Sequence, residues 1–260
     1  MNVRLRTALA AAVLAAALAG AASAAEPFVP KFLKKAPETT DLGVFRIWSH
    51  NHAVGTETFS YVLQGDSLVI GSHFRQPLKD GDTLRKVVAM AVSAFDYDLR
   101  FYQSNFEMPG RQETRGITFG DTVFTAYREM NGRGEGLTYL KPMGRLYALE
   151  SMAFVLFDVM CRNLAKREFE TWTMNVFALG PVDTLVTVRA RNLGEEQIRW
   201  GNAPVTARKI GFEDATTSYT AWIGPQGYML RLEHPFTSLR VEREPPPARQ
   251  AGASRRSPGS

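Results

Sequence analysis

The feature that most constrains the fold of this chain is a series of short segments in which apolar and polar residues alternate. Residues 44–50 (VFRIWSH), 56–64 (TETFSYVLQ) and 68–76 (LVIGSHFRQ) are rich in β-branched and aromatic side chains. The intervening segments NHAVG and GDS have the composition of tight turns. Because a period of two places the apolar side chains of a strand on one face, these segments predict an antiparallel meander of three strands.

Similar segments recur along the rest of the chain. Residues 85–95 contain β-branched valines, and we expect a strand there because residues 96–104 continue with alternating apolar side chains. Residues 115–132 predict a long strand or a hairpin that turns near Gly120, and NGRGEG at 131–136 predicts a flexible turn. The further expected strands are 171–179, 183–192, 197–202, 205–214, 218–225, 227–235 and 238–244. Their spacing, roughly 8 to 12 residues, is typical of sandwiches and barrels.

One segment has the periodicity of a helix. Residues 146–166 (LYALESMAFVLFDVMCRNLAK) contain neither glycine nor proline, and Leu149, Met152, Leu156 and Val159 follow the i, i+3, i+4 spacing. The single cysteine, Cys161, lies in this run and is expected to be a small buried side chain. The sequence therefore predicts a mainly β fold: a single curved antiparallel sheet, or half-barrel, of ten or more strands with one long apolar helix packed on its concave face.

The two ends of the chain differ from this body. Residues 1–24 combine two early arginines, an apolar run too short to span a bilayer and small residues before an expected cleavage after Ala24, which predicts a signal peptide. Residues 245–260 begin with three prolines and continue with Ala, Gly, Ser and Arg, which predicts a disordered tail. We therefore expect a lead-in at 25–43, a single β-rich domain at 44–244, and an exported protein that is periplasmic or extracellular.

Charge and motifs exclude several function classes. The formal net charge is +5 at pH 7, but the arginines of the leader and of the tail account for all of it. The body is therefore neutral and lacks the dense cationic patch that nucleic-acid binding requires. No phosphate-binding glycine loop, serine-nucleophile motif or paired Cys-x-x-Cys occurs in the sequence, so no cofactor is expected.

His50 and His52 form the first candidate site. At positions i and i+2 of a strand they would point to one face and could bind a metal ion together with Glu57 of the next strand. Asn51 and Gly55 indicate a turn at this place. We therefore expect two exposed histidines at the end of a β-hairpin rather than a metal site.

Asp96 and Asp98 form the second candidate site. Two carboxylates on one strand face could serve acid–base chemistry or the two-carboxylate scheme of glycosidases. They alternate with Tyr97 and Leu99, which is typical of a half-exposed strand. The expected role of this pair is therefore a solvated face.

The apolar side chains suggest a third kind of site. Phe59, Tyr61, Phe101 and Trp222 would line the sheet opposite the Met- and Phe-rich helix, and the space between could be a ligand cavity or a filled core. The expected polar groups at its rim are Glu57 and Arg231.

Two stretches of the chain resemble a group of exported, β-rich bacterial proteins of unknown function. The resemblance rests on a G-x-E-x-(F/Y) hairpin followed by a G-D-x-L turn, and on an A-W-I segment followed by glycine, leucine and arginine. The matching residues are Gly55, Glu57, Phe59, Gly65, Asp66, Leu68, Ala221, Trp222, Ile223, Gly227, Leu230 and Arg231. Such proteins are similar in outline to periplasmic lipoprotein carriers, whose half-barrel holds acyl chains under helices. The resemblance implies a fold and brings no catalytic residues with it.

The expected function is that of an exported, non-enzymatic envelope protein that binds a lipid or another apolar small molecule in the concavity of the sheet. One alternative is a hydrolase of envelope polymers that uses His50, His52 and Glu57, or the Asp96 and Asp98 pair. Another alternative is a scaffold that uses a sheet edge for protein contacts. The body contains no segment long and apolar enough to predict a membrane span.

Overall fold

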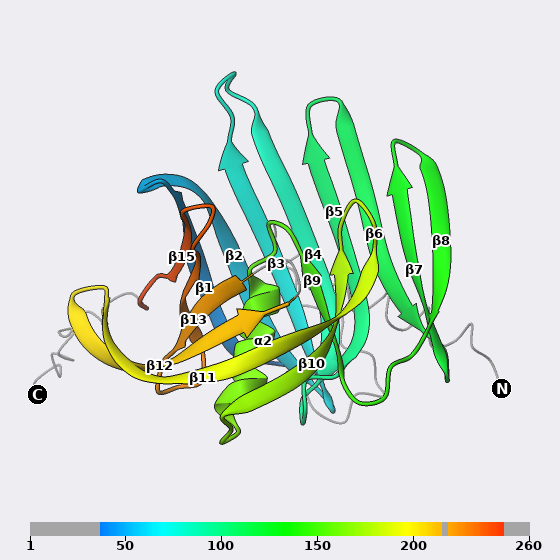
Figure 1. Cartoon of the computed structure of the whole chain (residues 1–260). Helices are drawn as coiled ribbons and strands as arrows, with labels where there is room; N and C mark the ends of the chain where they lie inside the picture. Colours follow the sequence, from blue (N-terminus) through cyan, green and yellow to red (C-terminus); the bar gives the residue numbers. More distant parts are fainter. Residues whose placement is uncertain (1–36, 215–217, 247–260) are drawn as a thin grey trace, which may run out of the picture.

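The computed structural model describes residues 37–214 and 218–246, and within them the fold is one curved, open sheet of 15 strands with a short helix. The strands run in the order β8-β7-β6-β5-β4-β3-β2-β1-β15-β14-β13-β12-β11-β10-β9 (Figure 1). Their bounds are β1 Glu38–Ser49, β2 His52–Gln64, β3 Ser67–Pro77, β4 Thr83–Ser93, β5 Leu99–Met108, β6 Arg111–Phe119, β7 Val123–Met130, β8 Arg133–Leu140, β9 Leu146–Glu150, β10 Thr171–Leu179, β11 Thr184–Trp200, β12 Ala203–Glu213, β13 Ser218–Ile223, β14 Met229–His234 and β15 Leu239–Arg243. The mainly β prediction is confirmed.

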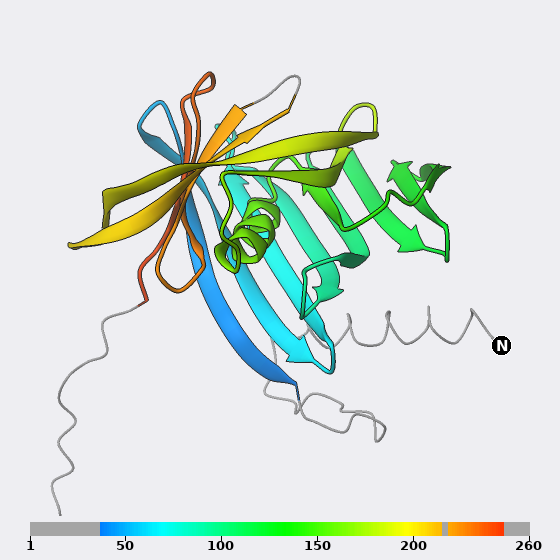
Figure 2. The ribbon, with the colours of Figure 1, turned by 60° about the horizontal axis from the view of Figure 1, so that its bottom comes forward.

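The sheet consists of two meanders that join at the middle. Strands β1 to β8 form one half and strands β9 to β15 the other, and β1 pairs with β15, with Ile47 opposite Val241. The sheet curls so that β10 comes back over the first half (Figures 1 and 2). At this closure Phe177 of β10 packs against Phe124 of β7 and Tyr139 of β8, with ring centroids 5.0 and 4.8 Å apart.

The first hairpin agrees with its sequence pattern. β1 and β2 are antiparallel and are joined by His50 and Asn51, both of which have positive φ angles, 49° and 63°. A two-residue loop with this backbone matches the right-handed twist of its strands, and asparagine adopts it at low cost. The expected meander of β1, β2 and β3 and the strand at β4 are confirmed.

The prediction of one long helix at residues 146–166 is wrong. Leu146–Glu150 is the strand β9, and only Val155–Ala165 forms the helix α2, which is 11 residues long. β9 pairs with β10 in parallel, so the sheet is not wholly antiparallel. Met152, with a φ of 60°, lies in the turn that separates strand from helix. A fully buried strand and a buried helix have the same apolar composition, so the pattern could not separate them.

Other boundaries also differ from the expectation. Asp96 and Asp98 lie in the turn between β4 and β5, not on a strand, and most of the NGRGEG segment lies in β8. Two expected strands merge into the long β11, which is bulged around Gly194. The sheet already begins at Glu38, within the expected lead-in, whereas the expected signal peptide and almost all of the expected tail lie outside the described residues.

Helix α2 fills the concave face of the sheet (Figure 2). Nine of its residues are buried, and it contacts β9, β13 and β14. Cys161 is fully buried there, and burial raises the pKa of its thiol well above the ordinary value. The prediction of a covered apolar helix with a buried cysteine is therefore confirmed, but for a shorter helix. Among the described residues, no helix has the length and apolarity needed to cross a bilayer.

Candidate functional site

Three of the six residues expected to bind a ligand lie together on the inner face. Glu57, Phe59 and Tyr61 are spaced by two along β2, and all three point into the concavity that α2 fills. The Phe59 ring stacks on Phe45 at 4.6 Å and meets the edge of Tyr61 at 6.0 Å. Their side chains are thus part of the packed core.

Glu57 connects the sheet to the start of the helix. One carboxylate oxygen accepts a hydrogen bond from the Ser72 hydroxyl at 2.6 Å, and the other accepts from the backbone N–H groups of Phe154 and Val155 at 2.8 and 3.2 Å. A carboxylate at a helix N-terminus satisfies free N–H groups and complements the helix dipole. Burial nevertheless raises the pKa of Glu57 to about 7, because it outweighs these hydrogen bonds. The prediction that Glu57 lies at a solvated rim is wrong, because its carboxylate is buried at the N-terminus of α2.

Asp158 is the centre of a second buried network. It accepts hydrogen bonds from the Tyr61 hydroxyl at 2.6 Å, from Arg162 Nε at 2.7 Å and from the Met229 backbone N–H at 2.8 Å. Arg162 also pairs with Asp41 of β1. The network therefore joins the helix to strands from both halves of the sheet.

A third network joins β9 to the first half of the sheet. Lys86 of β4 pairs with Glu150 of β9 at 2.7 Å, and the Tyr102 hydroxyl also donates to Glu150. Nearby, Arg115 pairs with Glu113 at 2.6 Å and with Asp183 at 2.7 Å. Each of these charged groups forms at least one ion pair with a group of opposite sign, which is the arrangement that buried ions require.

The other three predicted ligand residues lie on the outer face. Trp222 lies between Ala221 and Ile223, which are both in the inner core, so its side chain points outward, where Arg231 is its cross-strand neighbour. Phe101 likewise precedes the inward-facing Tyr102. The structure therefore does not bring the six residues into one site.

The histidine pair and Glu57 are separated. His50 and His52 are exposed at the first hairpin turn, whereas Glu57 is fully buried. Glu57 lies five positions after His52 along β2, a span of about 17 Å along a strand. No group of three or more potential metal-binding side chains occurs within residues 37–214 and 218–246.

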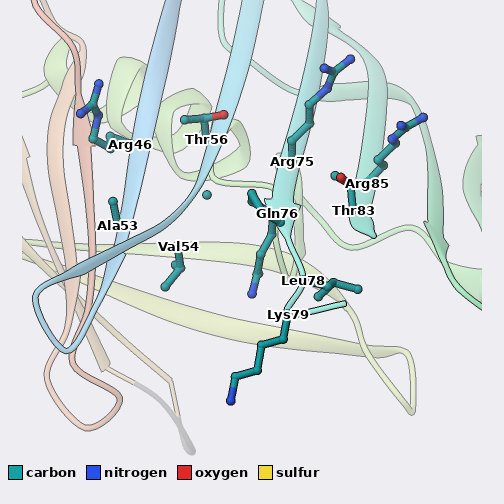
Figure 3. A pocket seen from close by; sticks show the side chains of 12 residues that line it. Arg46, Ala53, Val54, Thr56, Arg75, Gln76, Leu78, Lys79, Thr83 and Arg85 are labelled. Atoms are coloured by element: carbon teal, nitrogen blue, oxygen red, sulfur yellow. The ribbon is translucent and has the colours of Figure 1, made fainter. Parts of the chain in front are cut away.

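A large open hollow lies where β2 and β3 separate. Their pairing ends at Thr56 and Arg75, although β2 begins at His52 and β3 continues to Pro77. Beyond this last pair the strands diverge around a hollow of about 880 Å³ (Figure 3). We call it the β2–β3 notch, and it is lined by Arg46, Ala53, Val54, Gly55, Thr56, Arg75, Gln76, Pro77, Leu78, Lys79, Thr83 and Arg85.

A glycine allows the strands to approach each other at the base of the notch. A Cβ atom on Gly55 would lie 2.6 Å from the Arg75 backbone oxygen, closer than real contacts allow. The Gly55 of the hairpin motif is therefore required by the close approach of backbone. The notch depends on this contact for its shape.

The notch is cationic. Its lining contains four basic residues and no acidic one. Arg46 pairs with Glu244 at 2.5 Å, but Arg75, Lys79 and Arg85 are exposed and form no ion pair with an acid of the described chain. Burial together with the charges of Arg75 and Arg85 lowers the pKa of His73, which lies beside them on the outer face. Figure 3 shows the side chains of Arg46, Arg75 and Arg85 rising together from three different strands.

The strand register extends this charge into a row across the outer face. Directly paired residues on successive strands from β13 to β4 are Trp222, Arg231, Glu242, Arg46, Thr56, Arg75 and Arg85. Arg231 on β14 and Arg85 on β4 lie five strand spacings apart, which is about 24 Å. The row is not evident from the sequence, because residues far apart in the chain form it. The sequence shows only the alternation within each strand.

No family model and no curated protein matches this sequence. The fold is similar to a solved structure described as a β-barrel-like protein of a domain of unknown function, DUF1849, from Brucella abortus. The TM-score is 0.51 at 8% identity, and the similarity covers 78% of this chain and 94% of that chain. At this identity the similarity concerns the fold alone.

Proposed function

We propose that this protein is a binding protein of the bacterial envelope whose ligand is an anionic amphiphile held in the β2–β3 notch. The observation that carries the proposal is the lining: four basic residues without an acid, beside the apolar side chains of Val54, Pro77 and Leu78. Arginine and lysine recognise phosphate and carboxylate groups, and the apolar wall suits an alkyl chain. The expected export signal at residues 1–24 supports the envelope location.

The notch suits such a ligand in size and in accessibility. Its volume, about 880 Å³, lies in the range of small-molecule sites. Arg75, Lys79 and Arg85 form no ion pair with an acid of the described residues, although Glu107 of β5 is paired with Arg85 in the strand register. On the inner face, by contrast, Lys86, Arg115 and Arg162 already pair with acids.

The test is a calorimetric titration with dodecyl phosphate below its micelle concentration, with tetraethylene glycol monododecyl ether as the uncharged, sugar-free control of equal chain length. We expect saturable binding of the phosphate and much weaker binding of the ether. The double variant Arg75→Gln/Arg85→Gln should weaken phosphate binding about tenfold or more, since two charge-assisted contacts are lost. Added salt should weaken binding to the wild type as well.

A matched control removes two arginines elsewhere. Arg133 and Arg189 are both exposed, and neither lines the notch. The variant Arg133→Gln/Arg189→Gln has the same net charge as the notch variant and should bind dodecyl phosphate like the wild type. Equal weakening by both variants, or equal binding of dodecyl phosphate and the uncharged ether, would overturn the proposal.

A further inference from the structure

A second hollow adjoins the β2–β3 notch on the outer face, and the two share Arg46. It has a volume of about 580 Å³ and includes two tryptophans, Trp48 of β1 and Trp200 at the tip of the β11–β12 hairpin. We call it the Trp48–Trp200 hollow. Its lining is Arg46, Trp48, Ile198, Arg199, Trp200, Gly201, Leu230, Arg231, Glu242, Arg243, Glu244 and Pro245.

The hollow is formed by a hairpin that folds over the sheet. Trp200 Nε1 donates a hydrogen bond to the Arg243 backbone oxygen at 2.7 Å, which fixes the tip of the hairpin against β15. Beneath it, Ile198, Trp222 and Leu230 form a small apolar core on the outer face. The Trp200 side of the hollow is therefore anchored.

The polar groups of this hollow differ from those of the notch. Here acids and arginines alternate in pairs, with Arg231 and Glu242 at 3.1 Å and Arg46 and Glu244 at 2.5 Å. Such pairs offer hydrogen-bond donors and acceptors side by side. Of the two remaining arginines of the lining, Arg243 pairs with Asp41 at 2.6 Å, and Arg199 is exposed and forms no ion pair with a described acid. The paired donors and acceptors suit a ligand with many hydroxyl groups.

Two further donors border the hollow without a partner. Trp48 Nε1 and Arg231 Nε are shielded from water and have no acceptor in the described part of the chain. A shielded donor without an acceptor is unfavourable, and a ligand oxygen can supply the missing partner once the surrounding side chains move to admit it. Trp48 itself is half-buried, and Arg240 lies against its ring at 5.3 Å.

We propose that the Trp48–Trp200 hollow binds a sugar ring of a saccharide, with the indoles against its apolar face and the Arg–Glu pairs on its hydroxyl groups. The proposal concerns a hollow distinct from the notch and can hold without it. Where both hold, their shared Arg46 makes the two hollows one continuous site for a saccharide that carries an anionic group.

The test uses the four tryptophan indole N–H signals in ¹⁵N NMR spectra, each assigned with a Trp→Phe variant of the full chain. The probes are three neutral trisaccharides: tri-N-acetylchitotriose, maltotriose and mannotriose. We expect at least one of them to shift the Trp48 and Trp200 signals in a saturable way at millimolar concentration. The signal of Trp172, on β10, should not move.

Two variants and one control sharpen the result. Trp48→Ala should weaken the binding of that sugar about three- to tenfold, the usual contribution of an aromatic contact, whereas Trp172→Ala should not change it. Trp48→Phe keeps a ring and should recover part of the loss. Thermal melting of each variant shows that it is folded.

Two outcomes would overturn the saccharide proposal. One is that none of the three sugars moves Trp48 and Trp200 at about 20 mM, well above a millimolar Kd. The other is that Trp172 moves as much as they do. Because the sugars are neutral, the Arg75→Gln/Arg85→Gln variant should still bind them. If dodecyl phosphate binds but no sugar shifts the tryptophan signals, only the saccharide proposal fails. If a sugar shifts them but dodecyl phosphate does not bind, only the notch proposal fails.

Discussion

The inner face of the sheet and the β2–β3 notch on its outer face use charged residues in opposite ways. On the inner face Asp158 and Arg162, and likewise Lys86 and Glu150, are deeply buried and pair with one another. In the notch Arg75 and Arg85 stand side by side in the strand register with no acid between them. The same sheet therefore carries paired charges in its interior and unpaired cations at the notch.

This difference separates stability from binding. A buried charge without a partner is very costly, so the inner charges fix the helix and β9 in the concavity and are not available to a ligand. Exposed cations that repel one another cost little in water. The outer face can therefore keep unpaired arginines for a ligand, and variants of the two faces should behave differently.

The largest effect on stability is expected for Asp158→Ala. The change leaves Tyr61, Arg162 and the Met229 N–H without their buried acceptor and should lower the free energy of unfolding by about 3–5 kcal/mol. Glu244→Ala, which removes an exposed partner of Arg46, should cost at most about 1 kcal/mol. Chemical denaturation measures both, and similar losses would contradict the contrast between the faces.

The next effect is a pH dependence caused by Glu57. Its pKa is about 7 in the folded protein and near 4.5 when unfolded, so the folded state holds the proton more tightly. Stability should therefore fall as pH rises from 4.5 to 7, by about 3 kcal/mol. The neutral Glu57→Gln lacks this slope. Denaturation at several pH values measures the free energy of unfolding of both proteins. As pH rises from 4.5 to 7, the wild type should lose about 3 kcal/mol relative to this variant.

Other groups do not reproduce the Glu57 effect. Hydrogen bonds from Arg111 and Arg115 lower the pKa of Glu113 to about 2 despite its burial, so its contribution is lost only at pH values below 4.5. The lowered pKa of His73 makes stability rise with pH near 6.5, but both proteins share this term. Parallel pH profiles for wild type and Glu57→Gln would contradict the assigned role of Glu57.

A smaller effect is expected at the base of the β2–β3 notch. Gly55→Ala forces a Cβ atom against the Arg75 backbone oxygen and should cost about 1–3 kcal/mol of stability, as well as weaken dodecyl phosphate binding. Gly71→Ala, whose Cβ would meet only Ser60 Oγ at 3.7 Å, is the control and should be tolerated. Thermal melting separates the two, and equal melting temperatures would show that the strands can move apart at Gly55.

The smallest effect is expected on His73. Burial is the largest cause of the lowered pKa of the His73 imidazole, so removing one neighbouring charge in Arg85→Gln should raise that pKa only slightly. Arg133→Gln should leave it unchanged. NMR titration of the imidazole signals measures the difference, and an unchanged pKa in Arg85→Gln would mean that the notch cations are already neutralised.

Much of the fold was predictable from local pattern. Alternation in β2 correctly placed Glu57, Phe59 and Tyr61 on one face, and the turn residues correctly placed the first hairpin. The helix was overestimated because the apolar Leu146–Glu150 strand pairs with β10, a contact that the segment itself does not reveal. Local signals therefore predicted most of the elements, whereas the strand at Leu146–Glu150 depends on its partner strand β10.

The candidate sites were less predictable for a related reason. The outward-facing positions Arg46, Arg75 and Arg85 are visible in the alternation, but only the register across strands places them beside one another. Glu57 looked like a rim residue because a carboxylate is usually solvated, and the helix N-terminus that it binds is almost 100 residues away. No single segment of the sequence reveals that such distant residues come together.

The most direct test of the account is NMR mapping of bound dodecyl phosphate on backbone amides of the wild-type protein. The account predicts saturable shifts centred on Thr56, Arg75 and Arg85, with little change at Tyr61 or Met160 in the core. Shifts centred on Tyr61 and Met160, with the notch unaffected, would place the ligand in the concavity beneath α2 and contradict the division between a balanced interior and a binding surface.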